Sequence, residues 1–290
     1  MNNKKKVVEC INVNEKEFLS KYDSAKYEKP SVAVDISIFS LFDEKCTNYR
    51  KLPNKKLKIL LVRRGQHPCK GMHALPGGFV KPDETLEEAA YRELQEETGA
   101  RCNSLRQLRT FSDPNRDPRR RVITCAYTAL VDAKSQTIVG GSDAADAEWY
   151  DIHLRKENHQ EGIWKLTLLD NKSKLYAVLK ENSQKRVNEL PGLEILDSVG
   201  LAFDHALIIC YSLLKLREQI KYEPIVFNLL PPLFSLTEAQ QAYESILETK
   251  LYPQAFRRKI KGFVEETSDF AENRGHRPSK LYKLLKRYDE

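Results

Sequence analysis

The chain has 290 residues, which suggests one large domain or two smaller ones. With 41% hydrophobic and 31% charged residues, we expect a packed core and a soluble protein. No apolar stretch is long enough to span a bilayer, and the first ten residues lack the apolar region of a signal peptide. Six cysteines are dispersed without a Cys-x-x-Cys motif, so we expect a cytoplasmic protein, and the net charge of +7 indicates anionic partners such as nucleotides or DNA.

Strands are expected early in the chain, where β-branched and apolar residues cluster between polar loops. The expected strands cover residues 31–42, 57–64, 105–112 and 122–131. Two further runs, 164–169 and 174–179, predict a hairpin across residues 170–172. Residues 201–220 carry apolar side chains at helical spacing and predict a long helix.

Residues 78–99 join a glycine-containing turn to a helix whose apolar face becomes acidic. In a helical projection Leu86 and Ala90 point toward the protein body, and Glu93 and Glu97 fall on the same bearing. Carboxylates that face inward repel one another unless a cation joins them, and all-oxygen ligands suit Mg²⁺ or Mn²⁺. The pattern therefore predicts a divalent-cation site.

Both ends of this helix are encoded locally. Thr85 and Glu88 have the spacing of a capping box, and Gly99 is placed to end the helix in a left-handed conformation. Arg92 lies one turn before Glu96, close enough to pair with it. The alternative is a solvated acidic helix, but the agreement between the helix and its flanking loop favours the metal site.

The run resembles the Nudix box, Gly-x5-Glu-x7-Arg-Glu-apolar-x-Glu-Glu-x-Gly-apolar, with only a small residue at the final apolar position. The resemblance implies an α/β fold, an α/β/α sandwich around a mixed sheet, that hydrolyses a nucleoside diphosphate derivative with Mg²⁺ or Mn²⁺. It implies that Glu93 and Glu97 are the principal metal ligands and that Glu96 is a further ligand. Arg92 would orient these catalytic carboxylates, and Gly78 would lie at a loop that lends a carbonyl to the metal.

The organisation of the chain changes near residues 224–232, where prolines bracket a short apolar run. Ser235 and Glu238 form a second capping box, residues 252–263 can form a second helix, and residues 275–278 have the composition of a hairpin tip. Because the tail is basic, this succession matches a small C-terminal winged helix-turn-helix domain, although a solvated or dimerising tail is the alternative. The candidate DNA-binding residues are Arg257, Arg258, Lys259 and Arg277.

Segments outside the box resemble the Nudix-related transcriptional regulators, which join an ADP-ribose-sensing Nudix domain to a C-terminal winged helix. The matching stretches are 30–35, 75–80, 111–119, 202–205, 234–238 and 256–260. The resemblance implies a Nudix domain at 1–225, with an extension or insertion around 151–200, and a winged helix at 226–290. It also implies binding to double-stranded DNA as a homodimer, because operators are read as paired half-sites.

The residues that bind the substrate are less well marked. The loop 113–121 concentrates guanidinium groups, and Arg116 and Arg119 are the candidates to meet a diphosphate or a ribose. An equal alternative is a surface loop with locally paired arginines and aspartates. Arg63, at a strand end, is a weaker candidate, and His205 is expected to be structural rather than catalytic. The general base stays open among Asp143, Asp146, Glu148 and other acids.

Two functions follow from these patterns. The first is a metal-dependent Nudix pyrophosphohydrolase that cleaves the diphosphate of ADP-ribose or a related nucleoside diphosphate derivative. The alternative is a ligand-responsive, DNA-binding transcriptional regulator whose Nudix domain senses such a compound. The two are compatible, since an enzyme can destroy its own effector.

Overall fold

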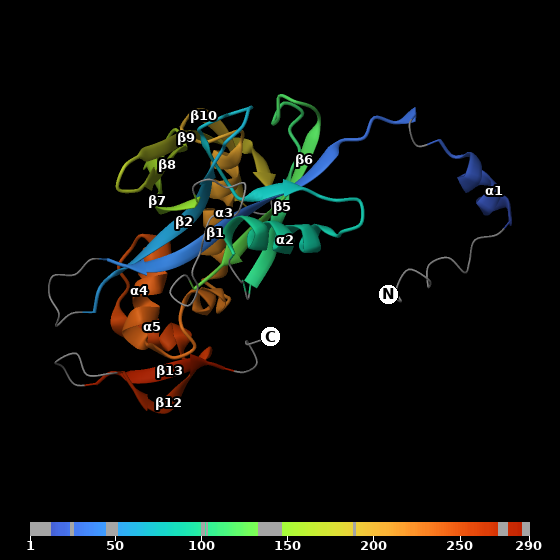
Figure 1. Cartoon of the computed structure of the whole chain (residues 1–290). Coiled ribbons are helices and arrows are strands. Elements are labelled where there is room, and N and C mark those ends of the chain that lie inside the picture. The colour runs from blue at the N-terminus through green and yellow to red at the C-terminus, as the bar shows by residue number, and fades with distance from the viewer. Residues whose placement is uncertain are drawn as a thin grey trace.

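The structure is a computed structural model, and it contains a large sheet domain followed by a small C-terminal domain (Figure 1). The residues that the structure describes are 13–23, 26–44, 52–99, 102, 104–132, 147–187, 190–271 and 278–285. None of the helices described is both long enough and apolar enough to cross a membrane.

The main sheet of the described chain has ten strands, of which eight follow the order β10-β9-β8-β7-β2-β1-β6-β5. The strands are β1 (Ser31–Asp43), β2 (Lys55–Arg63), β3 (His73–Ala74), β4 (Gly77–Phe79), β5 (Ser104–Phe111), β6 (Val122–Leu130), β7 (Ala147–Asn158), β8 (Ile163–Leu169), β9 (Lys174–Val187) and β10 (Leu190–Val199). β1 pairs in parallel with β6 and antiparallel with β2 and β4, so the sheet is mixed, as expected.

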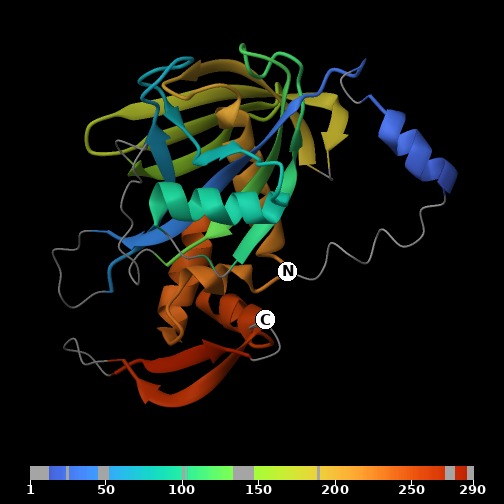
Figure 2. The same cartoon turned by 45° about the vertical axis from the view of Figure 1, so that its right-hand side comes forward.

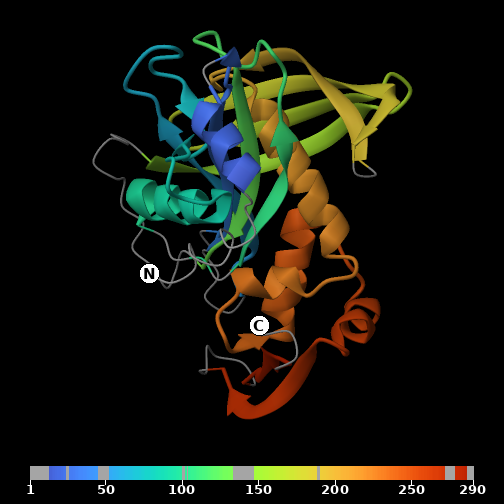
Figure 3. The same ribbon diagram turned by 90° about the vertical axis from the view of Figure 1, so that its right-hand side faces the viewer.

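Two helices cover opposite faces of this sheet, and the expected sandwich is confirmed. They are α2 (Leu86–Thr98) and α3 (His205–Gln219). Ala90 and Leu94 of α2 pack with Ile36 of β1 in one apolar cluster. Ile209 and Leu213 of α3 belong to the cluster on the other face. Figures 2 and 3 show α2 on one side of the sheet and α3 on the other. The sheet therefore holds the acidic helix and α3 on opposite sides of β1.

Residues 147–199 extend the sheet as an antiparallel meander, where the sequence predicted an extension or insertion around 151–200. β8 and β9 form the expected hairpin, with Leu169 opposite Lys174. β7 joins the meander to β2, with Tyr150 opposite Ile59. Figure 3 shows the meander projecting beyond the region that α2 and α3 cover. β7 is therefore the strand that connects this extension to the central part of the sheet.

The C-terminal part of the described chain is a winged helix-turn-helix, as the sequence predicted. Its elements are η2 (Ile225–Leu229), β11 (Phe234–Ser235), α4 (Leu236–Leu247), α5 (Pro253–Ile260), β12 (Val264–Phe270) and β13 (Lys280–Leu284). The three strands form one sheet in the order β11-β13-β12. The second helix ends at Ile260 rather than at 263, because the chain passes through Gly262 and then pairs as β12 with β13. The expected hairpin tip falls mostly outside the described residues.

The two domains share one apolar core. Tyr243 and Phe256 of the winged helix belong to the same cluster as Leu154 of β7 and Leu213 of α3. The expected boundary between residues 225 and 226 stays a prediction. A further helix that the sequence analysis did not predict, α1 (Val13–Lys21), lies away from the sheet in Figure 1.

Candidate functional site

The acidic helix α2 is fixed at both ends by the caps that the sequence predicted. The Glu88 backbone N–H donates to Thr85 Oγ1 at 3.2 Å, and the Thr85 N–H donates to Glu88 Oε2 at 2.7 Å. Gly99 ends the helix in the left-handed region with a φ of 64°, and its N–H donates to the Gln95 carbonyl. The acidic face of α2 is therefore held in a defined register.

Arg92 is the centre of an ion-pair cluster at one side of this face. Its guanidinium makes a bidentate contact with Glu84, at 2.6 and 2.9 Å, and also contacts Glu93 at 2.6 Å. The expected pair with Glu96 is present at 3.1 Å. Hydrogen bonds from Arg92 lower the pKa of Glu84 to about 2. The contact of Arg92 with Glu96 was expected, whereas its contact with Glu84 was not, although the motif contains Glu84.

Glu97 and Glu93 form the buried end of the acidic face, next to the loop of Gly77 and Gly78. The Gly77 N–H donates to Glu97 Oε2 at 3.2 Å, and Glu93 is only 8% exposed. Burial raises the pKa of Glu97 to about 7, and the neighbouring carboxylates of Glu93 and Asp35 add to this effect. This concentration of poorly solvated negative charge is the state that a cation would relieve.

The chemistry of these side chains fits a hard divalent cation. In the described chain no group of three His, Cys, Asp or Glu side chains is already arranged as a set of metal ligands, and Arg92 pairs with both Glu93 and Glu96. All the candidate donors are nevertheless oxygens, and burial, with the Glu93 and Asp35 carboxylates adding to it, raises the pKa of Glu97. Glu93, Glu96 and Glu97 are therefore the residues that would hold Mg²⁺ or Mn²⁺, with the backbone of Gly78 beside them.

Gly78 allows the backbone to approach the Glu93 carboxylate closely. A Cβ atom at this position would lie 2.2 Å from Glu93 Oε1 and 2.7 Å from its carboxyl carbon. We expect Gly78→Ala to displace Glu93, to destabilise the protein by about 1–3 kcal/mol and to weaken Mn²⁺ binding by about tenfold or more. Thermal unfolding and Mn²⁺ titration measure the two effects. The matched control is Gly65→Ala, because nothing lies within 4 Å of a Cβ at Gly65; equal effects of both changes would contradict this role of Gly78.

A cavity of about 440 Å³ opens beside the same glycine loop. Its volume is within the range of small-molecule sites. Gly77 and Gly78 line it together with Asp35 from β1, Phe203 from the loop before α3 and His205 from the start of α3. Because Gly77 also binds Glu97, the cavity and the acidic face share one loop.

The structure separates the three arginines that were expected to bind substrate. Arg119 lines the cavity and pairs with Asp117 at 2.7 Å, as the local-pairing alternative proposed. Arg63 is exposed, donates to the Gly71 carbonyl and is not among the cavity residues, whereas its neighbour Arg64 lines the cavity. Arg64 directly follows the end of β2, and its Nε donates to the Pro68 carbonyl at 2.9 Å.

Arg116 lines the cavity but is committed to two carboxylates. Its guanidinium contacts Asp204 at 2.8 and 3.0 Å and Asp35 at 3.2 Å, and its side chain is 5% exposed. Burial lowers the pKa of Arg116, but Asp204 and Asp35 outweigh burial and raise the pKa overall. Arg116 therefore connects the cavity wall to the start of α3.

Because Arg116 is buried and Arg119 is half-exposed, we expect replacement of Arg116 to destabilise the protein more than replacement of Arg119. Arg116→Met removes the guanidinium that pairs with the buried Asp35 and the partly buried Asp204, and we expect a loss of about 3–5 kcal/mol in the free energy of unfolding. Arg119→Ala removes a half-exposed side chain with one local pair, and we expect a change of less than about 1 kcal/mol. Urea denaturation of both variants measures the difference. Equal losses would show that the buried network contributes no more than the surface pair.

Two aromatic rings and His205 complete the cavity, and the sequence analysis did not predict the rings. The Arg119 guanidinium lies 5.6 Å from the Phe79 ring centroid and 5.9 Å from that of Phe203, and the Arg64 guanidinium lies 4.7 Å from Phe203. Phe203 adopts a φ of 51°, which is unusual for a bulky residue. The His205 Nδ1 accepts a hydrogen bond from the Leu75 N–H at 2.8 Å, which agrees with the structural role expected for this histidine.

Of the named candidates for the general base, the structure describes Glu148, which does not line this cavity. Glu148 accepts a hydrogen bond from the Tyr150 hydroxyl at 3.2 Å and pairs with Lys172 at 3.4 Å. Asp143 and Asp146 lie outside the described residues. The assignment of a base stays open.

The candidate DNA-binding surface is the exposed side of α5. Phe256 and Ile260 are buried, and Phe256 packs against Tyr243 of α4 with ring centroids 5.2 Å apart. Arg257 and Arg258 are consequently exposed. Lys259 is also exposed, but its ammonium lies 5.0 Å from the Tyr243 ring centroid. Arg277 lies outside the described residues.

Comparisons with known proteins agree with both halves of this architecture. The NUDIX domain model matches residues 51–169, and the NrtR DNA-binding winged helix domain model matches residues 226–284. The ADPR responsive transcriptional repressor NtrR of Acinetobacter baylyi is 32% identical, over 95% of this chain and 91% of its own length. The ADP-ribose pyrophosphatase of Methanocaldococcus jannaschii is 38% identical, over 48% of this chain and 73% of its own length.

Solved structures extend the similarity over the whole fold. A MutT/nudix family protein from Enterococcus faecalis superposes with a TM-score of 0.70 and 27% identity, covering 94% of both chains. Shewanella oneidensis NrtR in complex with a 27mer DNA gives a TM-score of 0.60 and 25% identity, covering 88% of this chain and 93% of that one. The chain therefore belongs to the Nudix hydrolase superfamily, in the branch that carries a C-terminal NrtR winged helix domain.

Proposed function

We propose that this protein is a DNA-binding transcriptional regulator that responds to ADP-ribose or a related nucleoside diphosphate derivative. The observation that carries the proposal is the presence, in one packed chain, of a ligand-sized cavity beside the acidic helix and a winged helix with an exposed basic helix. The similarity to a relative named as an ADPR responsive repressor, over nearly the full length of both chains, supports it. This brings forward the function that the sequence analysis gave as the alternative.

The chemistry of the cavity suits such a ligand. Arg64 and Arg119 offer guanidinium groups to a diphosphate, and the Phe79 and Phe203 rings offer apolar faces to a nucleobase. The other two arginines expected to bind substrate are less available to the ligand. Arg63 does not line the cavity, and Arg116 lines it but pairs with Asp35 and Asp204. A bound divalent cation would neutralise the diphosphate at the carboxylate end of the site.

Hydrolysis of the ligand is a second function that a specific observation favours. The carboxylates of Glu93, Glu96 and Glu97 are all present, and Arg92 orients two of them. A catalytic cation at these oxygens would polarise a P–O bond and activate a water. A carboxylate face that stays poorly solvated without a cation supports retention of metal binding, and metal binding makes turnover possible.

We also propose that the protein acts on DNA as a homodimer. A single α5 of eight residues can reach only a short stretch of a groove, and regulators with such helices bind two half-sites about one helical turn apart. Sedimentation of the protein with and without duplex DNA measures the number of copies bound.

The test begins with a duplex selected from a random-sequence pool by the purified protein. We expect sequence-specific binding of this duplex by fluorescence anisotropy, and a shift of at least fivefold in affinity when α,β-methylene ADP-ribose is added. Chromatography of ADP-ribose incubated with the protein and Mg²⁺ tests hydrolysis separately. Failure to select any duplex, or an affinity indifferent to the analogue, would overturn the regulatory function; absence of products would overturn hydrolysis alone.

A further inference from the structure

The helix α3 joins the ligand cavity to the winged helix. Its 15 residues span roughly 22 Å at the usual helical rise. The residues immediately before and at its start, Phe203 and His205, line the cavity, and Arg217 in its last turn contacts α4 of the winged helix. One rigid element therefore touches both functional parts of the molecule.

The start of α3 is bound to the cavity wall. Asp204 accepts two hydrogen bonds from Arg116, and Arg116 also contacts Asp35 of β1. His205 is 4% exposed and is attached to the backbone of Leu75, which precedes the glycine loop. A ligand that contacts the cavity would therefore act on groups that hold the first turn of α3.

The end of α3 is bound to two other elements through Arg217. Nη1 of this guanidinium donates to the Leu154 carbonyl of β7, Nε donates to the Ile246 carbonyl of α4, and Nη2 donates to Glu248 Oε2, all at 2.8 Å. The side chains of Arg217 and Glu248 are 16% and 13% exposed. One partly buried side chain thus connects α3, the Nudix sheet and the end of α4.

Glu248 is placed to receive this contact. It follows α4 directly and adopts a left-handed conformation with a φ of 52°. Its carboxylate also contacts His153 Nδ1 at 2.6 Å and accepts from the Leu154 N–H at 3.3 Å. A cation at this point also suits the carbonyl groups that end a helix. The end of α4 is therefore held against β7 by groups of the Nudix domain.

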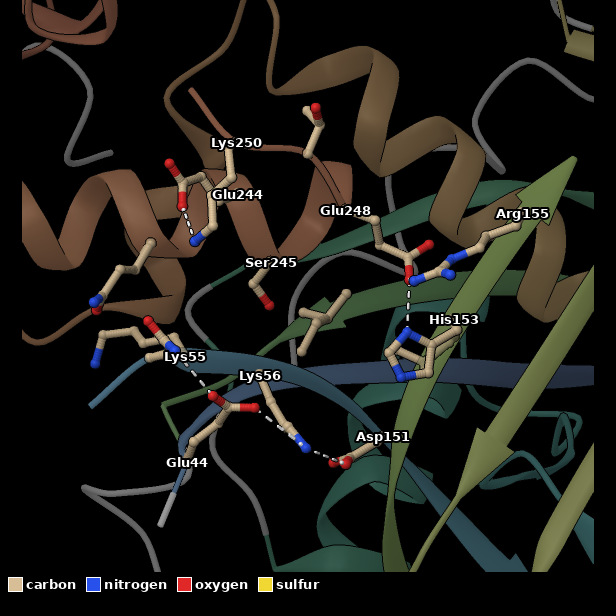
Figure 4. Close-up of a pocket in the computed structure, with 15 residues that line it drawn as sticks. Glu44, Lys55, Lys56, Asp151, His153, Arg155, Glu244, Ser245, Glu248 and Lys250 are labelled. Atoms are coloured by element: carbon tan, nitrogen blue, oxygen red, sulfur yellow. Dashed lines mark hydrogen bonds and ion pairs between the residues drawn. The ribbon is translucent and has the colours of Figure 1, made fainter. Parts of the chain in front are cut away.

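Ala242 and Ile246 pack α4 against the sheet, and an open groove runs along one side of this contact. A cavity of about 390 Å³ lies there, and Lys55, Asp151 and Ser245 are among the residues that line it (Figure 4). At the start of α4, Lys55 of β2 lies 3.8 Å from Glu238. Lys55 and Arg217 thus contact α4 near its two ends, and a displacement of Arg217 would change one of these two attachments beside an open groove.

We propose that Arg217 is a positioning residue that couples occupancy of the ligand cavity to the orientation of α4, and thereby to the DNA affinity of α5. The inference rests on the proposed regulatory function, and it assigns the coupling between the ligand cavity and the DNA-binding helix α5 to one side chain. Energetic coupling can be carried by a rigid element that contacts both sites, and α3 with Arg217 is such an element.

The test compares ligand and DNA binding in the full-length wild type and two variants. In Arg217→Met the three hydrogen bonds are lost, and in Glu248→Gln the charge is removed while the contacts of Arg217 with the carbonyl groups can remain. The ratio of duplex affinities without and with α,β-methylene ADP-ribose is the readout. We expect a wild-type ratio of roughly 5- to 150-fold that falls below about twofold in Arg217→Met and to an intermediate value in Glu248→Gln.

Separate binding measurements distinguish coupling from loss of structure. Isothermal titration should give an analogue affinity within about threefold of wild type for both variants, because neither residue lines the ligand cavity. The control is Lys250→Met, which breaks an exposed pair with Glu244 inside the winged helix and should leave the ratio unchanged.

Each outcome decides between the inference and the function beneath it. An unchanged ratio in folded Arg217→Met overturns the role of Arg217. An equal fall of the affinity ratio in Lys250→Met overturns this role as well, because it would show that loss of any polar contact of the winged helix weakens the coupling. If Arg217→Met does not fold, the ratio in Glu248→Gln decides alone. A wild type that binds neither probe overturns the proposed function instead.

Discussion

Replacement of Glu97 by Gln is expected to reduce metal-dependent hydrolysis of ADP-ribose by about 1,000-fold or more. The change keeps the volume of the side chain but removes a negative charge from the centre of the proposed metal site, and a catalytic cation supplies several kcal/mol of transition-state stabilisation. Glu97 is held by the Gly77 N–H, so the amide can occupy the same position. Release of AMP at the wild-type rate by this variant would disprove the metal-ligand assignment.

The same substitution is expected to stabilise the metal-free protein. The folded-state pKa of Glu97 is raised to about 7 from 4.5, so its ionisation opposes folding above pH 4.5, and the full penalty is present above pH 7. In EDTA at pH 8 we expect Glu97→Gln to be about 1–3 kcal/mol more stable than wild type, and at pH 4 equally stable. Mg²⁺ should remove the advantage, because the cation stabilises only the carboxylate form.

Both parts of this prediction can be measured with one pair of variants. Urea denaturation in EDTA and in Mg²⁺ gives the stabilities, and chromatography of ADP-ribose digests gives turnover. Glu87→Gln is the matched control, because this exposed residue lies on the same helix outside the acidic face. If the wild type shows no measurable turnover, the stability comparison in EDTA is the remaining test. A Glu97→Gln variant that is no more stable than wild type would then contradict the proposed destabilisation by the buried Glu97 carboxylate.

Features set by short-range interactions were predictable from the sequence. The limits of α2, its acidic face and the pair of Arg92 with Glu96 depend on residues within one or two helical turns of each other. The capping box at Ser235 and Glu238 is local in the same sense. Helical periodicity and capping rules describe such contacts well, because the chain geometry alone places the groups.

Features that depend on the tertiary fold were not predictable in the same way. Arg116 meets Asp204 and Asp35 across 88 and 81 positions of sequence, so its loop gives no sign that the guanidinium is buried rather than free for substrate. The choice of Arg64 over Arg63 depends on where β2 ends, which sequence patterns locate only approximately. Arg217 looks like an ordinary charged residue at the end of a helix until α4 and β7 are placed around it.

Simultaneous replacement of Arg257 and Arg258 by alanine is expected to weaken binding to the selected duplex by at least about 30-fold. Phe256 and Ile260 hold α5 against the domain, so the two arginines are presented outward and removing them leaves the fold intact. In the described part of the chain neither arginine has an ion-pair partner that would compete with DNA. Each direct contact of an arginine with a base is worth about 1–3 kcal/mol, and each phosphate contact contributes to the salt dependence.

Salt dependence and a charge-matched control distinguish a recognition helix from a merely basic tail. If Arg257 and Arg258 both contact phosphates, the slope of log affinity against log salt should become less steep by about two. If they contact bases, the slope should change little and the preference for the selected duplex over a scrambled one should fall. Lys165→Ala with Lys172→Ala removes the same charge from the Nudix meander, where both lysines pair with glutamates. An equal loss of affinity in that control would mean that net charge, and not the surface of α5, determines binding to DNA.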